Sequence, residues 1–423
     1  MRLSDVFGIA AKKLETYVER GADDDFKRCL QGRQHIVLHG SSKQGKTSLR
    51  KRYLDDNQAI AVSCQSDWDL PHMYLSILRR AGYQPKLIEE RVGAAHGTVR
   101  LDLGVPGLGV KLGGNPKQYE KVEYKYDGID PNDPNDIIDG LKAIKFNKWI
   151  VVEDFHYLPP ETQDKFAGHL KSFSDHSDVR FVLVAIWIGK NKITARGDLA
   201  GRVVAVDADF WPDMFLREVL TRGENALNIE FPKSCKEEII KVSSGSVFLV
   251  QDICNGLCQL QKIYEPQKGW RKTSVGQANA IGPILEQAVN QLSPVYLSFL
   301  QGFAQGFNRS KLEMYKWILY AILTADIDKL KKGLTFDELE RAIQRVHPSG
   351  IGSSGNLRNA LIKVDELQWK KNIKPFVIDY DEVGKRLHIV DKSFFIWRKH
   401  QDAKELLAHI DLAMPDGGKL AAS

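Results

Sequence analysis

The sequence predicts an α/β fold in which a parallel β-sheet is covered by helices on both faces. Five short apolar runs have the length and composition of buried strands. Segments with helical periodicity separate these runs, and this alternation is typical of a parallel sheet. A glycine-containing loop connects the first run to the helix that follows it. The five predicted strands are 35–39, 59–63, 149–152, 181–188 and 203–206. Helices are predicted over residues 1–33, 70–81 and 247–260, among others.

The loop at 40–48 reads G-S-S-K-Q-G-K-T-S and matches the phosphate-binding pattern G-x-x-x-x-G-K-[ST]. Gly40 and Gly45 permit backbone angles at which successive N–H groups turn toward an anion. The helix that begins at Thr47 adds partial positive charge. We expect ATP to bind here, with the Lys46 amine at its β- and γ-phosphates and the Thr47 hydroxyl on Mg²⁺. The fold class is then that of a P-loop NTPase, and a glycine turn between two core elements is the structural alternative. The predicted nucleotide-binding residues are Gly40, Ser41, Ser42, Lys43, Gln44, Gly45, Lys46, Thr47 and Ser48.

Two carboxylates, Glu153 and Asp154, follow the apolar run at 149–152. A strand of this kind in a P-loop ATPase usually delivers an aspartate to the metal and then a glutamate that polarises the attacking water. Here the order is reversed, so by register Glu153 takes the metal position and Asp154 the water position. Either carboxylate can perform either role, and both are therefore candidate catalytic residues and candidate Mg²⁺ ligands. The reversed order predicts slow hydrolysis, and two surface acids at a strand end are the structural alternative.

Composition restricts the class of protein. A length of 423 residues suggests two or three domains, and 43% hydrophobic with 27% charged residues is ordinary for a globular chain. The net charge of +6 permits contact with nucleic acid without requiring it, because no long basic run is present. Five cysteines without a regular framework suit a reducing cytoplasm. Cys254 and Cys258, one helical turn apart, are interpreted as core packing. No signal peptide or membrane-spanning run is found, so we expect a cytoplasmic protein with no membrane partner.

The chain divides into three predicted domains and a tail. Residues 1–230 form the nucleotide-binding domain, with N-terminal helices and a β-hairpin insertion near 98–113 that alternates around Pro106-Gly107. This hairpin is expected either to pack on its own domain or to reach a neighbouring subunit or partner. Residues 231–307 form a helical lid, 308–413 a C-terminal domain, and 414–423 a disordered tail.

The C-terminal domain shows the element order of a winged helix-turn-helix. Three predicted helices, at 312–323, from the Thr335 capping box, and at 355–368, precede two strands that flank a turn at 381–385. From residue 308 onward there are 20 Lys and Arg against 16 Asp and Glu, and acids interrupt the third helix. Duplex DNA and a protein partner therefore both stay open. The predicted phosphate contacts for DNA are Arg358, Lys363, Lys385 and Arg386.

These motifs and this order of elements together resemble an AAA+ ATPase of the STAND-like and origin-recognition-like group, over roughly residues 20–400. The resemblance implies a polar sensor after the fourth strand, for which Asn191 is the candidate. It implies an arginine finger that reaches the nucleotide of a neighbouring subunit, with Arg202 as the first candidate and Arg196 as the second. The lid segment 245–251 has no arginine, which is similar to STAND lids. His156 either reads the nucleotide state or packs in the core.

Three functions follow from this resemblance. The first is a slow ATPase switch that couples nucleotide to homo-oligomerisation through the ATPase domain and to a protein effector, as in bacterial defence or mobile-element systems. The second is a DNA-binding initiator or transposition ATPase that uses the winged helix on duplex DNA. The third is a protein-binding adaptor with structural nucleotide.

Overall fold

The computed structural model describes residues 1–8, 14–83, 87–95, 108–112, 119–126, 129–186, 193, 196–307, 313–350 and 353–412. The chain forms two compact units. The first comprises Met1–Gly32, Ile36–Asp55 and Leu183–Ser423, and the second comprises Arg33–His35 and Asp56–Val182. Within the described residues, no helix is both long and apolar enough to cross a membrane.

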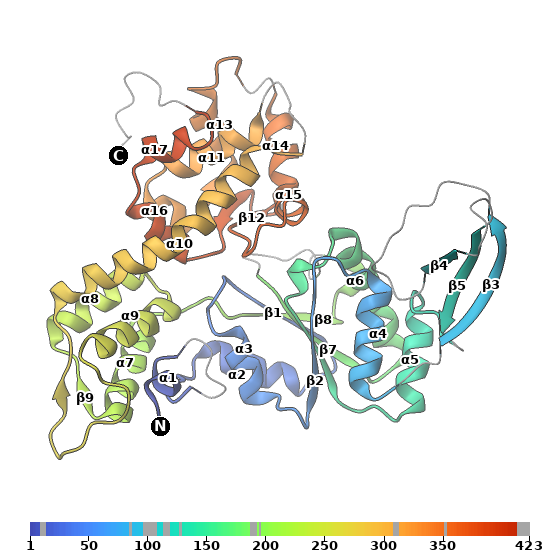
Figure 1. The fold of residues 1–423 in the computed structure, drawn as a ribbon, viewed down its shortest axis with the longest axis horizontal. Helices are drawn as coiled ribbons and strands as arrows, with labels where there is room; N and C mark the ends of the chain where they lie inside the picture. The colour runs from blue at the N-terminus through green and yellow to red at the C-terminus, as the bar shows by residue number, and fades with distance from the viewer. Residues whose placement is uncertain are drawn as a thin grey trace. The chain divides into compact units, whose positions relative to one another are not determined.

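A five-stranded sheet forms the centre of the α/β fold (Figure 1). Its strands follow the order β2-β6-β7-β1-β8, with β2 parallel to β6. Every residue of β1 and β6 is buried, as expected for strands that are rich in Val and Ile and covered on both faces. This arrangement confirms the predicted fold class. The bounds are β1 His35–His39, β2 Ala59–Ser63, β6 Trp149–Glu153, β7 Arg180–Val184 and β8 Val203–Asp207.

Four helices belong to the chain segments that connect these strands. α4 has the bounds that the sequence predicts, because its ends carry strong signals: the Asp69 carboxylate accepts the His72 N–H, and Gly82 takes a left-handed conformation after the last turn. Its buried face is apolar and includes Met73 and Ile77. The helices are α3 Lys46–Tyr53, α4 Leu70–Ala81, α5 Pro134–Ala143 and α6 Pro160–His176.

An antiparallel three-stranded sheet lies in the insertion between α4 and α5. Its order is β3-β5-β4, with β3 Leu87–Ala95, β4 Leu108–Leu112 and β5 Tyr119–Tyr126. Of the hairpin predicted at 98–113, the structure describes β4 alone, which pairs with β5. The Pro106-Gly107 turn of that prediction lies outside the described residues.

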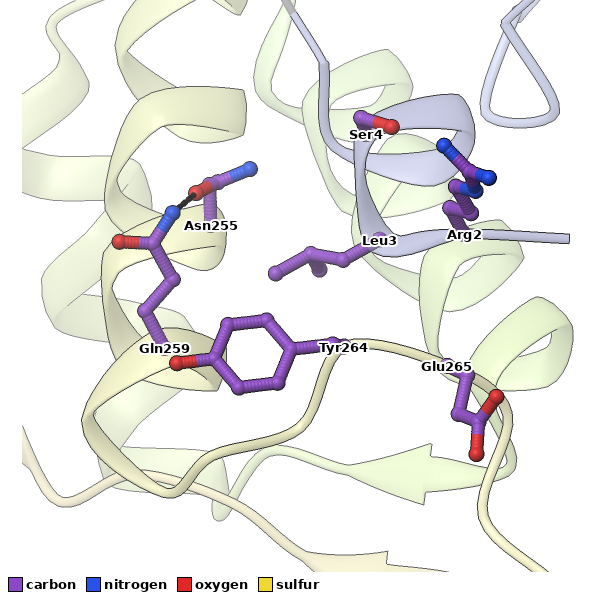
Figure 2. Close-up of a pocket in the computed structure, with 7 residues that line it drawn as sticks. All are labelled: Arg2, Leu3, Ser4, Asn255, Gln259, Tyr264 and Glu265. Atoms are coloured by element: carbon purple, nitrogen blue, oxygen red, sulfur yellow. Dashed lines mark hydrogen bonds between the residues drawn. The ribbon is translucent and has the colours of Figure 1, made fainter.

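A helical region follows β8, and α1 (Leu3–Val6) packs into it. The Leu3 N–H donates to the Tyr264 carbonyl at 2.8 Å, and the Asn255 amide donates to the Phe7 carbonyl at 2.8 Å. A pocket of about 400 Å³ lies between this N-terminal segment and α9 (Figure 2). Gly223 gives the Phe7 ring its space, because a Cβ there would lie 2.0 Å from Phe7 Cζ. The elements are α7 Asp213–Leu227, β9 Ile229–Glu230, α8 Lys233–Ser243, α9 Val247–Leu260, β10 Thr273–Ser274 and α10 Ile281–Ala304.

The N-terminal stretch 1–33 is helical only in part. Besides α1, it contains α2 (Gly21–Leu30), and between them residues 17–20 have no regular secondary structure. Residues 9–13 lie outside the described part. The interpretation of the whole stretch as helical is therefore wrong for 17–20, where Arg20 has extended backbone angles and donates to the Gln44 carbonyl of the phosphate-binding loop.

The C-terminal region contains helices at the three predicted places and the predicted hairpin, together with α12 and β11, which the sequence analysis did not predict. The Thr335 capping box is confirmed: Thr335 Oγ1 accepts the Glu338 N–H at 3.2 Å, and a Glu338 carboxylate oxygen accepts the Thr335 N–H at 2.8 Å. The strands β12 and β13 pair antiparallel, and β11 adds a third strand next to β13. The elements are α11 Met314–Thr324, α12 Ile327–Lys332, β11 Leu334–Thr335, α13 Phe336–Gln344, α14 Ser354–Ile362, α15 Val364–Lys370, β12 Ile378–Asp381, β13 Arg386–Ile389, α16 Ser393–Lys399 and α17 Ala403–Ala408.

The helix predicted at 355–368 is two helices in the structure. Lys363 separates α14 from α15 with the non-helical angles φ −101° and ψ 11°. The redirected α15 carries the buried Gln368 to the hairpin, where its Oε1 accepts the Val377 N–H at 2.8 Å and its amide donates to the Ile378 carbonyl at 2.8 Å. These bonds satisfy backbone groups that β12 would otherwise bury without partners.

Candidate nucleotide-binding site

The loop at 40–48 lies between β1 and α3, as the sequence predicts. Gly40 and Gly45 have φ values of +139° and +84°, and Gly45 is the N-cap residue of α3. A Cβ on Gly40 would lie 3.1 Å from the Asp209 backbone nitrogen, so a larger residue would push the loop away from this neighbour. Both glycines therefore have a conformational reason for their positions, and Gly40 has a steric reason as well.

Lys46 is buried at 8% exposure and is held by the loop itself. Its ammonium donates to the Gly40 carbonyl at 2.9 Å and to the Ser41 carbonyl at 2.6 Å. Thr47 is exposed in the first turn of α3. Since the first N–H groups of a helix lack acceptors within the helix, the backbone of Lys46, Thr47 and Ser48 suits an anion. The loop thus fits the phosphates of a nucleotide.

Arg20 fixes the loop from the N-terminal side, a role that the sequence analysis missed. Its guanidinium donates to the carbonyls of Ala208 at 2.8 Å and Gln44 at 3.1 Å. It also lies 3.9 Å from the centroid of the Trp211 ring, whose indole N–H donates to the Gln44 carbonyl at 3.2 Å. Burial lowers the pKa of this guanidinium to about 10, which still leaves it charged at neutral pH. Arg20 therefore joins the loop to the end of β8.

Asp209, just after β8, contacts the loop and the C-terminal region at once. Its carboxylate accepts from the Ser41 hydroxyl at 2.9 Å and the Ser41 N–H at 3.2 Å. The Lys392 ammonium lies 3.1 Å from the same carboxylate and donates to the Asp209 carbonyl at 3.3 Å. Next to it, the Ser42 N–H donates to the Val390 carbonyl at 2.8 Å. We call these contacts, made by Ser41, Ser42, Asp209, Val390 and Lys392, the loop–C-terminal junction.

Helix α9 also contacts the loop. The Lys43 ammonium lies 4.2 Å from the centroid of the Phe248 ring, a cation–π distance. Burial raises the pKa of the Asp252 carboxyl on the same helix, and the positive charge of Lys43 opposes that rise. The N-terminus of α9 is capped by Ser246, whose hydroxyl accepts the Leu249 N–H. The loop therefore contacts α9 as well as the C-terminal region.

The acidic pair lies in the second unit, at the end of β6. Glu153 is the last residue of the strand, is 8% exposed, and aligns with Ser63 of β2. Asp154 follows in the left-handed region at φ +57° with its side chain exposed. Asp tolerates this conformation better than most residues, so the backbone turn and the carboxylate are compatible. The buried position of Glu153 and the exposed position of Asp154 distinguish two carboxylates that the sequence left equivalent.

The remaining candidates have varied surroundings. Arg202 is half-buried between a short 3₁₀ turn and β8, where a guanidinium nitrogen donates to the Asp198 carbonyl at 3.4 Å. Arg196 pairs with the Asp198 carboxylate at 3.3 Å. Asn191 lies outside the described residues. His156 is 2% exposed, and its ring centroid lies 4.1 Å from that of Tyr157. Of the two alternatives for this residue, reading the nucleotide state or packing in the core, this arrangement is the packed one.

Cys254 and Cys258 lie buried in the core of the helical region. Burial raises the pKa of the Cys258 thiol to about 12 and that of Cys254 further. Apolar surroundings of this kind disfavour the thiolate that a metal site needs. Both thiols therefore behave as small core residues.

Comparisons with known proteins give distant matches. No protein-family model matches the chain, and no curated protein matches it in sequence. Solved structures that align with it include the ORC1 protein of Aeropyrum pernix in complex with DNA, at 12% identity and a TM-score of 0.46 over 95% of this chain and 96% of that chain. A Walker-type ATPase of Pyrococcus abyssi aligns at 14% identity and a TM-score of 0.47, over 90% and 96% of the two chains. The RuvB Holliday junction branch migration motor of Thermotoga maritima aligns at 10% identity and a TM-score of 0.38, over 91% and 97%. Identities this low leave the function of this chain open.

Proposed function

We propose that this chain is an ATP-binding switch with slow ATPase activity, in which the nucleotide at 40–48 determines whether the C-terminal region stays docked on the loop. The observation that carries this proposal is the loop–C-terminal junction. Asp209 holds Ser41 on one side and Lys392 on the other, and Val390 is bonded to Ser42. A change in the loop backbone must therefore strain or break contacts with the C-terminal region.

Residues of the loop would bind the triphosphate. Lys46, positioned by two loop carbonyls, would contact the β- and γ-phosphates, and the N-terminus of α3 would add its partial charge. Mg²⁺, when bound, neutralises charge on these phosphates, and Thr47, Glu153 and Asp154 are the residues that would hold it. Of the two acids, buried Glu153 suits the metal and exposed Asp154 suits the orientation of a water molecule.

The strength of the junction sets how easily the switch opens. The Asp209 and Lys392 side chains are 21% and 19% exposed, so solvent screens their attraction only in part. A charge-assisted bond in such a place contributes about 1 kcal/mol, between the values for exposed pairs and for buried bonds to charged groups. A bound triphosphate that favours another loop conformation by a similar amount would shift the docking equilibrium about fivefold.

Lys392→Ala is expected to release the C-terminal region without nucleotide. Loss of the ion pair should speed hydrogen–deuterium exchange in residues 386–398 by about fivefold, which corresponds to about 1 kcal/mol. In the unaltered protein, ATP should produce a similar acceleration, and in Lys392→Ala the additional effect of ATP should be small. Mass spectrometry of peptides from this segment measures both.

Lys399→Ala is the matched control, since Lys399 is an exposed lysine at the end of α16. It should leave exchange in 386–398 unchanged. Asp209→Asn combined with Lys392→Ala should have less than the sum of the two single effects, because both substitutions remove one bond. Additive effects of the two substitutions would refute the coupling between nucleotide and docking. So would a hydrogen–deuterium exchange rate that ATP does not change in the unaltered protein.

Arg202→Ala is expected to lower the ATPase rate by about 10³ with ATP affinity unchanged, if Arg202 acts on the nucleotide of a neighbouring subunit. Arg202 lies next to β8 and is half-buried, and its guanidinium contacts the carbonyl of exposed Asp198. A mixture of the Arg202→Ala and Asp154→Asn proteins should regain activity. The Asp154→Asn subunit supplies the intact Arg202, and the Arg202→Ala subunit supplies the intact Asp154. Arg196→Ala tests the second finger candidate, and it should leave the rate unchanged if Arg202 is the finger. A specific rate that does not depend on protein concentration, with no recovery on mixing, would make the chain a monomeric ATP binder.

The initiator hypothesis needs free cations on the C-terminal region for duplex DNA. Of the four predicted phosphate contacts, Arg386 donates to the carbonyls of Gly333 at 2.7 Å and Lys332 at 3.3 Å. Lys363 lies 6.0 Å from the centroid of the Phe307 ring. Arg358 and Lys385 are exposed, so the duplex-binding initiator stays open as the alternative to the switch. The switch proposal also includes a protein effector and a role in defence or mobile-element systems. Only the family resemblance of the sequence supports these two parts.

A further inference from the structure

The loop at 261–274, which follows α9 and ends in β10, carries exposed aromatic and basic side chains. Trp270 is 86% exposed and Tyr264 is 58% exposed, both among the most exposed large apolar side chains that the structure describes. The loop carries one carboxylate, Glu265, against four cations. These cations are Lys262, Lys268, Arg271 and Lys272, and all four are exposed.

The backbone of this loop is firmly anchored. Buried Ile263 and Val275 fix its two ends in the core. In the middle, the Asn228 amide donates to the carbonyls of Gln267 at 2.9 Å and Gly269 at 3.0 Å. The Gln267 N–H donates to the Leu227 carbonyl at 2.8 Å, and β10 pairs with β9. The backbone that carries the exposed side chains is therefore already ordered before a ligand binds. This order lowers the conformational entropy that binding would cost.

Cation and ring are combined at the tip of the loop. The Arg271 guanidinium lies 4.2 Å from the centroid of the Trp270 ring. The Lys272 ammonium donates to the Asn225 amide oxygen at 2.6 Å, which holds this charge on α7. A large exposed indole beside fixed positive charges is the combination that binds unpaired bases, because the ring stacks on a base while the cations meet adjacent phosphates.

We propose that the 261–274 loop binds single-stranded nucleic acid, with Trp270 stacked on a base and Lys268, Arg271 and Lys272 at the phosphates. A single strand fits better than a duplex, because in a duplex the base faces are already stacked on each other. This function is separate from the switch and requires no ATP hydrolysis. It also places nucleic-acid contact on the helical region and away from the C-terminal domain.

Fluorescence anisotropy of a labelled oligodeoxythymidine, titrated with the full chain at two salt concentrations, tests the proposal. Trp270→Ala should weaken binding by between about 5- and 150-fold, the loss that corresponds to one base–aromatic stack. Trp270→Phe should retain much of the affinity. Arg271→Ala combined with Lys272→Ala should reduce the log–log salt slope by about 0.7 for each phosphate that the protein no longer neutralises.

The charge-matched control is Lys233→Ala combined with Lys241→Ala, two exposed lysines of α8. This control should leave the salt slope unchanged. Since Trp270 is almost fully exposed, its replacement should not alter the thermal unfolding midpoint, which is measured in parallel. Absence of binding by the unaltered chain would overturn the proposal. An affinity that Trp270→Ala does not change would also overturn it. A preference for duplex DNA that Trp270→Ala does not change would overturn it too, and would point to the C-terminal domain as the binding surface.

Discussion

Lys46→Ala is expected to abolish tight ATP binding. The ammonium is placed at the loop by the Gly40 and Ser41 carbonyls, and its removal deletes a charge-assisted contact to phosphate worth roughly 1.5–3 kcal/mol. The dissociation constant should rise by between about 10- and 150-fold. Isothermal titration calorimetry with ATP and Mg²⁺ measures this change directly.

Lys51→Ala provides the matched control, because it removes an exposed lysine from the same helix α3. Its affinity for ATP should equal that of the unaltered chain. Lys46→Arg separates charge from shape, since the positive charge stays while the compact ammonium is replaced. A folded Lys46→Ala protein that binds ATP normally would show that the loop is only a turn between core elements.

Glu153→Gln and Asp154→Asn are each expected to reduce ATP hydrolysis by about 10²–10⁴, while at least one of the two variants still binds ATP. Both changes preserve shape and remove only charge and basicity. Asn tolerates the left-handed backbone at position 154 as well as Asp does, so the fold should survive. If the exposed acid orients water, Asp154→Asn should bind ATP normally and Glu153→Gln should show weaker dependence of binding on Mg²⁺.

Asp164→Asn, on the exposed side of α6, serves as the control for loss of a carboxylate in the same unit. It should hydrolyse ATP at the unaltered rate. Binding and single-turnover hydrolysis measured side by side separate the two roles. Unaltered turnover in both Glu153→Gln and Asp154→Asn would remove the acidic pair from the mechanism.

Elements with strong local signals could be predicted from the sequence. The bounds of α4 and α9 agree with the prediction residue for residue, because a capping side chain precedes each helix and an apolar face continues through it. Strands β1 and β2 were equally clear as short apolar runs between turns. The break at Lys363 was not predicted; beyond it Gln368 accepts the Val377 N–H of the hairpin, a tertiary contact that the local sequence does not mark.

The site divides in the same way. The phosphate-binding loop and the acidic pair each consist of residues that are close together in the sequence. Their spacing alone is therefore enough to predict them as site residues. Arg20 reaches Ala208 across 188 residues, and Lys392 reaches Asp209 across 183. In the sequence, Arg20 is one charge in the charged run 20–25, and Lys392 is one of many surface-type lysines. No periodicity or motif marks a partner that only folding brings near.

The packing of α1 into the helical region has a consequence for biosynthesis. Phe7 and its partner Asn255 are 248 residues apart, so the first apolar side chains leave the ribosome long before their binding surface exists. At 5–20 residues per second this interval lasts roughly 10–50 s. During that time Leu3, Val6 and Phe7, all buried in the finished fold, are exposed to the cell. Docking of this segment is therefore a non-local step that waits until α9 has been made.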